Sequence, residues 1–315
     1  MTPARAARAA TAAPAVTEIS DDEFALFQAL ICREAGIHLA PSKKPMLVSR
    51  LMRRVNALKL ASFGDYYRCV INDRMDEMVR LLDAVSTNET WFFRNPKHFS
   101  FVRETLCPAW LAEARDSRRP RRVTAWSAAS SSGEEPFSLA MVLLDGLPGW
   151  DIQILATDLS SRVLERAAAA TWSIDKSGDI PPRYLKRFML RGTGAQDGKM
   201  KAGPEIRNLV TFRRFNLNDE HWPIEAEPPF DLVFCRNVLM YFEARRRERV
   251  LKRIVRRLPP NGYLFLGDAE ALTGFEGMRL ASPAVYTTKT NPDLARIKAD
   301  AGQAGQAGND RKGAP

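Results

Sequence analysis

The stretch RVTAWSAASSSGEEPFSLA at residues 122–140 decides the fold of this protein. A run of strand-forming residues, Val123–Ser127, leads through small residues into a helical pattern at Glu135–Leu144. The same succession follows at once, because Ile152–Thr157 has strand composition and Ser161–Ala170 has helical spacing. Strands that alternate with helices pair in parallel and carry helices on both faces. The stretch therefore predicts an α/β domain built on a doubly wound sheet.

The alternation continues toward the C-terminus and is interrupted once. The further elements expected are strands at Val210–Phe215, Leu232–Cys235 and Tyr263–Leu266, and a helix at Ala244–Leu258. The run AVYTTK at 284–289 is expected as an antiparallel edge strand. The interruption contains the Gly/Lys-rich stretch RGTGAQDGKMKAG and predicts an inserted β subdomain at about 172–212.

Residues 18–90 predict a small helical domain. Ser20 and Glu23 form a capping-box signal, helical spacing follows, and Gly36 ends the helix. The other expected helices begin after Pro41-Ser42 and at Ser62, and cover residues 75–85. We expect the α/β domain at 91–290, and disorder at 1–17 and 291–315, where the composition is biased and no periodicity is present.

Bulk composition limits the functions open to the chain. Its 315 residues allow two domains, and its net charge of +10 predicts an acidic partner, which could be nucleic acid, anionic lipid or a protein surface. No apolar run is long enough to span a membrane and the N-terminus is a poor secretory signal, so a cytoplasmic location without membrane insertion is expected. Four scattered cysteines and three histidines predict no metal site.

The loop SAASSSGEEP after the first strand indicates a ligand that approaches the backbone closely, because its side chains are small. It matches GxGxxG poorly and lacks a phosphate-loop lysine, so the ligand need not carry a pyrophosphate. Asp158, which ends the second strand, stands where acids commonly hold ribose hydroxyls. A serine-rich connection and a helix-capping acid are the plain alternatives. Loop and acid together favour a nucleoside ligand such as S-adenosylmethionine.

Four segments carry a more specific pattern. They are STNETWFFR (Ser86–Arg94), SAASSSGEEPFSLA (Ser127–Ala140), FDLVFCRNVLMYF (Phe230–Phe242) and LPPNGYLFLGDAE (Leu258–Glu270). In order and spacing they resemble the chemotaxis receptor methyltransferases, the CheR family, from about Asp21 to Lys289. The resemblance implies a helical N-terminal domain followed by a class I, Rossmann-like methyltransferase domain with an inserted β subdomain.

The resemblance also implies an activity. The family transfers a methyl group from S-adenosylmethionine to glutamate side chains of methyl-accepting chemotaxis receptors, which leaves methyl esters and S-adenosylhomocysteine. The cofactor-binding positions would be Asn88, Thr90, Arg94, Glu135, Asp158, Asn216, Leu217, Arg236 and Asn237. Among them, Glu135 would hold the methionine amino group, Asp158 the ribose, and Asn216-Leu217 would flank the adenine. Arg94 and Tyr241 would face the substrate carboxylate and serve as catalytic residues.

Two groups of these positions have further implied roles. Asn88, Thr90 and Arg94 would lie in an inter-domain segment that closes over the cofactor. Arg236 and Asn237 would line the cofactor beside the methyl group.

Several residues in these segments have plainer interpretations. Trp91–Phe93 could be core aromatics, and Glu134 could be an acid that interacts with a helix dipole. Cys235 is interpreted as a buried strand residue, and ARRRER at Ala244–Arg249 as a solvated helix face. Asp268 stands where the family often has a histidine, which leaves local contacts there open.

The expected mechanism needs orientation and no base. A glutamate side chain has a pKa of about 4.3, so it is already an anion at neutral pH. Arg94 can hold the carboxylate by charge-assisted hydrogen bonds, and Tyr241 can orient the carboxylate or the methyl group.

A basic helix is the expected contact for acidic receptor helices. Residues 40–64 contain no acid, and the proposed receptor-binding residues are Lys43, Arg50, Arg53 and Arg54. We expect the three arginines on one exposed face, opposite the apolar residues of their helix. A solvated face is the alternative.

The alternatives to this function are a methyltransferase of the same fold that acts on RNA or a small molecule, and a non-catalytic cofactor sensor. Nucleic acid is disfavoured, because the basic residues lack interleaved aromatics for base stacking. We expect a monomer recruited to receptor arrays at the membrane. The inserted hairpin resembles versions that tether a receptor tail, a point that the sequence leaves open.

Overall fold

The computed structural model describes residues 18–272 and 275–289, and its Cα positions divide the chain into two compact units. We call them the helical unit (Met1–Ser86) and the sheet unit (Thr87–Pro315). The segments at 1–17 and 291–315, which we expected to be disordered, lie outside the described residues.

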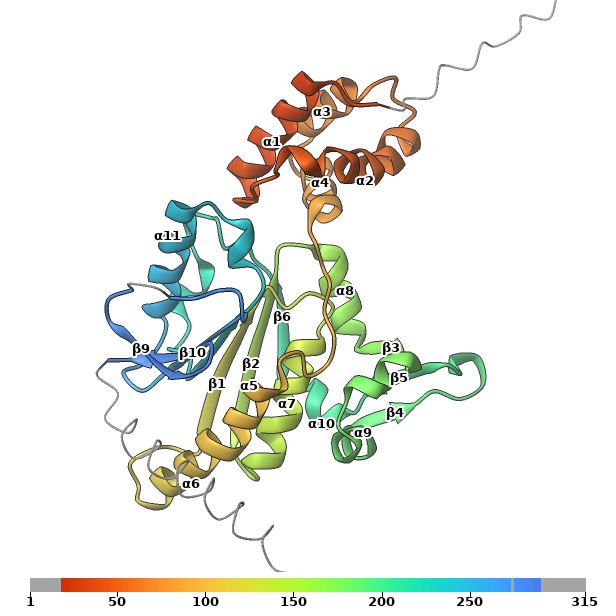
Figure 1. Cartoon of the computed structure of the whole chain (residues 1–315). Helices are drawn as coiled ribbons and strands as arrows, with labels where there is room; N and C mark the ends of the chain where they lie inside the picture. Colours follow the sequence, from red (N-terminus) through yellow and green to blue (C-terminus); the bar gives the residue numbers. More distant parts are fainter. Residues whose placement is uncertain (1–17, 273–274, 290–315) are drawn as a thin grey trace, which may run out of the picture. The chain divides into compact units, whose positions relative to one another are not determined.

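Residues 18–86 of the helical unit form four α-helices (Figure 1). They are α1 (Asp21–Ala35), α2 (Lys44–Ala57), α3 (Phe63–Asn72) and α4 (Glu77–Val85), with the 3-10 turn η1 (Pro41–Lys43) before α2. The expected capping box is present, because Ser20 Oγ accepts the Glu23 N–H at 3.1 Å and the Glu23 carboxylate accepts the Ser20 N–H at 2.9 Å. Gly36 ends α1 with a φ of 74°, which favours glycine.

The sheet unit is built on a seven-stranded sheet in the order β6-β2-β1-β7-β8-β10-β9. The strands are β1 (Arg122–Ala128), β2 (Asp151–Asp158), β6 (Val210–Arg214), β7 (Leu232–Cys235), β8 (Tyr263–Leu266), β9 (Met278–Ser282) and β10 (Val285–Thr288). The pairs from β6 to β8 are parallel, whereas β10 pairs antiparallel with both β8 and β9. The expected doubly wound α/β fold is confirmed.

One expectation about this sheet is wrong. The expected antiparallel strand is present as β10, within residues 284–289, but β9 lies beyond it and is the edge. Strand β9 is weakly apolar and Leu280, at its centre, is 54% exposed, so the sequence offers no burial pattern from which to predict it.

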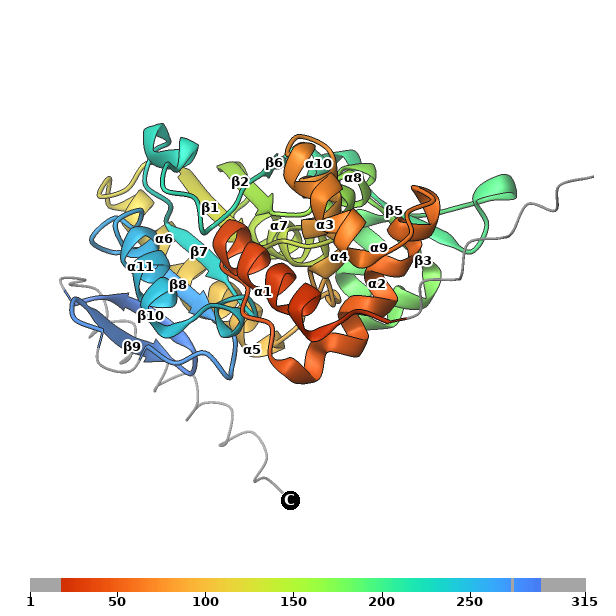
Figure 2. The same cartoon turned by 90° about the horizontal axis from the view of Figure 1, so that it is seen from above.

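Helices cover both faces of the sheet, as Figures 1 and 2 show. The helices of this unit are α5 (Pro96–Phe101), the π-helical turn η2 (Val102–Leu106), α6 (Cys107–Arg115), α7 (Glu134–Gly146), α8 (Ser161–Ala169), α10 (Pro204–Arg207) and α11 (Ala244–Val255). Because successive strand residues point to opposite faces, Ala125 packs in one core with Leu139 of α7, and Trp126 packs in a second core with Val250 of α11.

An antiparallel subdomain interrupts the alternation after α8. Its three strands pair in the order β3-β5-β4. They are β3 (Thr171–Ser173), β4 (Met189–Arg191) and β5 (Lys199–Ala202), accompanied by η3 (Ile174–Asp179), α9 (Pro182–Phe188) and η4 (Gly194–Gln196). We expected the insertion to extend to about residue 212, but β6 belongs to the main sheet, where it pairs with β2.

Candidate active site

The carboxyl ends of β1, β2 and β7 bring the site together. Strand β1 lies between the other two, and Ala128 pairs with Thr157 on one side and Cys235 on the other. The next residues, Asp158 and Arg236, therefore flank the loop that follows β1. Ligands of doubly wound sheets bind at such a point, where connections leave in opposite directions.

The loop after β1 is shaped by left-handed backbone and held by Asp158. Ala129, Ser131 and Gly133 have φ values of 64°, 48° and 94°. The Ser131 N–H donates to Asp158 Oδ2 at 2.8 Å, and the Ser160 N–H donates to Asp158 Oδ1 at 2.9 Å. A carboxylate oxygen can accept more than one hydrogen bond, so both oxygens retain capacity for a hydroxyl.

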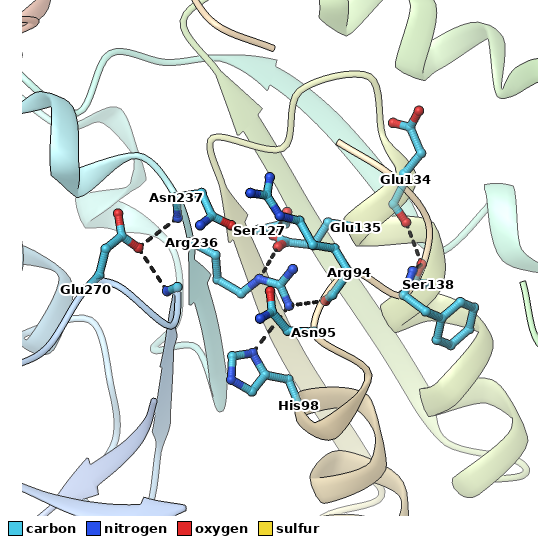
Figure 3. Close-up of polar contacts among 12 residues, drawn as sticks. Arg94, Asn95, His98, Ser127, Glu134, Glu135, Ser138, Arg236, Asn237 and Glu270 are labelled. Atoms are coloured by element: carbon cyan, nitrogen blue, oxygen red, sulfur yellow. Dashed lines mark hydrogen bonds and ion pairs between the residues drawn. The ribbon is translucent and has the colours of Figure 1, made fainter. Parts of the chain in front are cut away.

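A buried ion pair occupies the centre of the site (Figure 3). Arg236 Nε lies 2.9 Å from Glu135 Oε2, and Ser127 Oγ donates to Glu135 Oε1 at 2.7 Å. Burial raises the pKa of Glu135, while Arg236 and the Ser127 hydroxyl lower it. Burial likewise lowers the pKa of Arg236, against the opposing effect of Glu135. Each charge compensates the other in a place where either alone would be costly.

A buried histidine, His98, contacts the guanidinium of Arg236. The Arg236 Nη1 donates to the Arg94 carbonyl at 2.7 Å and lies 3.3 Å from His98 Nδ1. His98 is 2% exposed, and burial, followed by the charge of Arg236, lowers its pKa to about 4. The imidazole is therefore neutral at pH 7, which allows Nδ1 to accept from the guanidinium. Sequence reasoning missed His98. The signal that could have indicated it is its position, four residues after Arg94, in the helix α5.

Arg94 reaches the same space from the segment before α5. Its Nη1 donates to the Glu89 carbonyl at 3.0 Å, and its guanidinium carbon lies 4.4 Å from the centre of the Trp91 ring. Trp91 is 39% exposed, whereas Phe92 and Phe93 are 1% and 7% exposed. Two of the three aromatics are thus core residues, and the third orients an arginine by a cation–π contact.

Glu270 organises the loop that carries Asn237. Its carboxylate accepts four backbone N–H groups, from Asn237 (2.7 Å), Leu239 (2.7 Å), Met240 (3.2 Å) and Gly267 (2.9 Å). Asn237 has a φ of 57°, a strained value for a residue with a side chain. Glu270 belonged to a segment that carried the family pattern, but sequence reasoning assigned it no role.

Comparison with known proteins identifies the architecture around this site. The family model "CheR methyltransferase, SAM binding domain" matches residues 88–284, and "CheR methyltransferase, all-alpha domain" matches residues 22–86. The chain belongs to the CheR family. It is accordingly an S-adenosylmethionine-dependent methyltransferase of the chemotaxis class.

Named relatives cover most of the chain. Chemotaxis protein methyltransferase 2 of Pseudomonas aeruginosa is 37% identical over 251 residues, which are 79% of this chain and 86% of the relative. The chemotaxis protein methyltransferase of Salmonella typhimurium is 37% identical over 257 residues, 80% of this chain and 84% of the relative. That of Escherichia coli is 36% identical over 263 residues, 82% of this chain and 87% of the relative.

The remaining positions that the CheR resemblance marked are placed as follows. Asn88 and Thr90 contribute backbone carbonyls, which accept from Ser131 Oγ at 3.0 Å and Lys176 Nζ at 3.5 Å. Asn216 accepts the Asn218 N–H at 3.0 Å, and Leu217 beside it is buried. Tyr241 ends the turn η6 (Leu239–Tyr241) and is half-buried.

Two of the plainer interpretations can now be judged. Glu134 is fully buried and pairs with Lys176 of the inserted subdomain, while its Oε2 accepts from Ser132 Oγ at 2.7 Å. Glu134 does stand in the first turn of α7, as that interpretation expected, and it also joins two parts of the fold. Cys235 is fully buried on β7, as its interpretation as a buried strand residue expected, and burial raises the pKa of its thiol well above the ordinary value.

The expected exposed face of three arginines on α2 is wrong for two of them. Arg50 Nη1 donates to the carbonyls that end α4, including Val85 at 2.8 Å. Arg54 pairs with the buried carboxylate of Glu77, with Nε at 2.9 Å. Both arginines flank the buried stripe of α2 and stabilise the helical unit, whereas Lys43 and Arg53 are exposed.

Two kinds of feature, a membrane-spanning helix and a metal-binding group, are absent from the described part of the chain. No helix there has both the length and the apolar character that a bilayer crossing requires. Nor do the histidines, cysteines and acids of those residues form a group of three or more that could hold a metal ion.

Proposed function

We propose that this CheR-family chain methylates glutamate side-chain carboxylates of methyl-accepting chemotaxis receptors, producing methyl esters and S-adenosylhomocysteine. The observation that carries the proposal is the pairing of charges at the site. Glu135 and Arg236 neutralise each other, which leaves the partly exposed Arg94 as a cation available to an incoming carboxylate. The relatives' names, chemotaxis protein methyltransferases, agree with such a substrate.

The residues around the β1 loop fit the chemistry of S-adenosylmethionine. The small residues of the loop leave its backbone open to approach, and Asp158 offers two carboxylate oxygens for ribose hydroxyls. Glu135 is an acid of the right charge for an amino group, and Asn216-Leu217 follow the neighbouring strand β6 at the same edge. When bound, S-adenosylmethionine supplies an electrophilic methyl group on a sulfonium sulfur.

The chain's own task is to orient and to exclude water. We propose that Arg94 and Tyr241 position the acceptor carboxylate, because a guanidinium forms charge-assisted hydrogen bonds with it. Too strong a pair would reduce the nucleophilicity of the carboxylate, and Arg94 is already shared with Trp91 and the Glu89 carbonyl. Arg236 and Asn237 would line the cofactor beside the methyl group.

The site favours a carboxylate over an amine or a hydroxyl as acceptor. Amines and alcohols must lose a proton, which calls for a base with a pKa near neutrality. His98, the histidine at this site, has a pKa of about 4, is buried, and directs Nδ1 at Arg236. An acceptor that is already ionised needs no such base.

Receptor recognition is proposed for the exposed cations of the helical unit. Lys43 and Arg53 remain available to acidic receptor helices, while Arg50 and Arg54 shape the surface that presents them. We propose a monomeric, cytoplasmic protein that is recruited to receptor arrays, and a receptor tail as an additional ligand of the inserted subdomain.

The test is the chemistry of the transferred label. Membranes enriched in receptors are incubated with the protein and methyl-labelled S-adenosylmethionine, then treated with mild alkali. A methyl ester releases volatile methanol, whereas N-methyl groups stay bound. Arg94→Ala should abolish most of the label while S-adenosylhomocysteine still binds, and Lys97→Ala, a nearby exposed cation, should not. Alkali-stable label, or label in RNA, would overturn the proposal.

A further inference from the structure

Helix α11 and the turn after it carry four arginines that contact one loop. We call Arg246, Arg249, Arg253 and Arg257 the arginine row. Their spacing of three and four residues places them along one side of the helix. All four donate to the segment 218–228, which connects β6 to β7. The interpretation of ARRRER as a solvated face holds for most of its residues, because Arg246 alone among the six is not exposed, yet Arg246 and Arg249 also donate to this loop.

The first half of the row converges on Asn218. Its Oδ1 accepts from Arg246 Nη1 at 2.9 Å and from Arg249 Nη2 at 3.1 Å, and its carbonyl accepts from Arg249 Nη2 at 3.3 Å. Asn218 is 8% exposed. Two guanidinium groups thus share one neutral, buried oxygen, an arrangement that brings like charges together and fixes the amide firmly.

The second half of the row holds the rest of the loop. The Arg253 guanidinium lies 4.1 Å from the centre of the Trp222 ring, and its Nη2 donates to Glu225 Oε1 at 3.0 Å. Arg257 donates to the carbonyls of Glu225 at 3.1 Å and Pro228 at 3.3 Å. The loop contains only the short turn η5 (Pro223–Ala226), so these contacts add to the order that buried Trp222 and Ile224 give it.

The contacts lead directly to the expected nucleoside side of the site. Asn216 Oδ1 accepts the Asn218 N–H at 3.0 Å, and Asn216-Leu217 are the residues proposed to flank the adenine. From this chain of contacts we infer that Arg246 and Arg249 are positioning residues, which act through Asn218 to set the nucleoside-binding segment. The inference rests on the proposed cofactor role of Asn216-Leu217 and not on the identity of the methyl acceptor.

Two ligands separate the nucleoside side from the methionine side. S-adenosylhomocysteine has both parts, whereas 5′-methylthioadenosine lacks the amino acid. The double variant Arg246→Gln/Arg249→Gln should weaken both ligands about equally, by tenfold or more. Glu135→Gln should weaken S-adenosylhomocysteine alone. Calorimetric titration of the full chain measures both dissociation constants.

The same helix offers a matched control. Arg245 and Arg247 are exposed, so Arg245→Gln/Arg247→Gln removes the same charge and should leave both affinities unchanged. A second pair of variants guards against misfolding. Asn218→Asp keeps an acceptor for both guanidinium groups and should retain binding, whereas Asn218→Ala should lose it as the double variant does.

The inference is overturned if the row and control variants bind both ligands equally well, or if the row variants weaken S-adenosylhomocysteine alone. It is also overturned if Asn218→Asp fails as badly as Asn218→Ala. These binding measurements involve no methyl acceptor. Alkali-stable label in the methylation experiment would therefore contradict the proposed substrate and leave the inference about Arg246 and Arg249 unaffected.

Discussion

Replacing Glu270 by glutamine tests how far one buried carboxylate holds the active site together. The four N–H groups that it accepts come from both ends of the site loop, Asn237 to Met240 and Gly267. Glutamine has nearly the same shape but turns one acceptor oxygen into an NH2 donor. Whichever oxygen is replaced, two backbone donors lose their partner and face another donor.

The size of the effect follows from those contacts. A hydrogen bond to a charged group contributes about 1.5–3 kcal/mol, and an unsatisfied buried donor costs about 1–3 kcal/mol. Because Glu270 is buried and the two lost bonds are neighbours that relax together, we expect a destabilisation of about 2–4 kcal/mol rather than the full sum. The strained φ of Asn237 should relax as well, so S-adenosylhomocysteine should bind at least tenfold more weakly.

Denaturant unfolding followed by tryptophan fluorescence measures this cleanly. All six tryptophans lie in the sheet unit, so the signal reports the unit that contains Glu270. Glu276→Gln makes the same chemical change at an exposed position and should alter stability by less than about 0.5 kcal/mol. If Glu270→Gln behaves like Glu276→Gln, the four hydrogen bonds do not organise the loop and the reasoning is refuted.

Three further predictions address other parts of the molecule. Because the folded pKa of His98 is about 4, against an ordinary 6.5, its contribution to stability should be fully present above about pH 6.5 and be lost as pH falls toward 4. That contribution is at most about 3.4 kcal/mol at 1.36 kcal/mol per pKa unit. The stability of His98→Gln between pH 4 and 7 should depend correspondingly less on pH, and parallel curves would contradict the prediction. Asp158→Ala should weaken S-adenosylhomocysteine by tenfold or more in calorimetry without unfolding the protein, and an unchanged affinity would remove Asp158 from the site. Lys43→Glu/Arg53→Glu should slow receptor methylation in a salt-dependent manner with stability unchanged. Arg54→Ala, in contrast, should destabilise the helical unit by about 2–4 kcal/mol, measured by circular dichroism, because it leaves the buried Glu77 with the longer contact to Arg80 at 3.5 Å. Normal methylation by Lys43→Glu/Arg53→Glu would contradict a receptor-binding role for Lys43 and Arg53. Normal stability of Arg54→Ala would contradict a stabilising role for Arg54.

Local signals were sufficient where one element's own sequence determines its structure. The capping box of Ser20 and Glu23, the strand compositions, and the helix that follows SAASSSGEEP all depend on neighbours within a few residues. The order and spacing of the four segments were enough to indicate the CheR family, and three of them contain the carboxyl end of a strand, β1, β7 or β8, at one edge of the sheet. Glu135 and Arg236 could be named on that basis, and Asp158 from its place at the end of the second strand.

Charge partners could not be read in the same way. The helical spacing of Arg50 and Arg54 was visible, but the Val85 carbonyl and the Glu77 carboxylate that engage them come from α4, 35 and 23 residues away. The loop contacts of the arginine row on α11 were missed for the same reason, since Asn218 and Glu225 lie 28 residues before Arg246 and Arg253, which donate to them. Composition alone cannot say whether a cation faces water or a distant acceptor.

Sequence by itself determined the order of the elements, the parallel sheet and the family, since these follow from local propensity and from motifs contiguous in the chain. Only the tertiary structure decided which polar groups satisfy one another. His98 of α5 contacts the Arg236 guanidinium, and Glu270, in the segment after β8, accepts the Asn237 N–H. Both contacts form because packing brings these segments to the same edge of the sheet. A buried charge is stable only beside its partner, and that partner is selected by packing between segments that the chain keeps far apart.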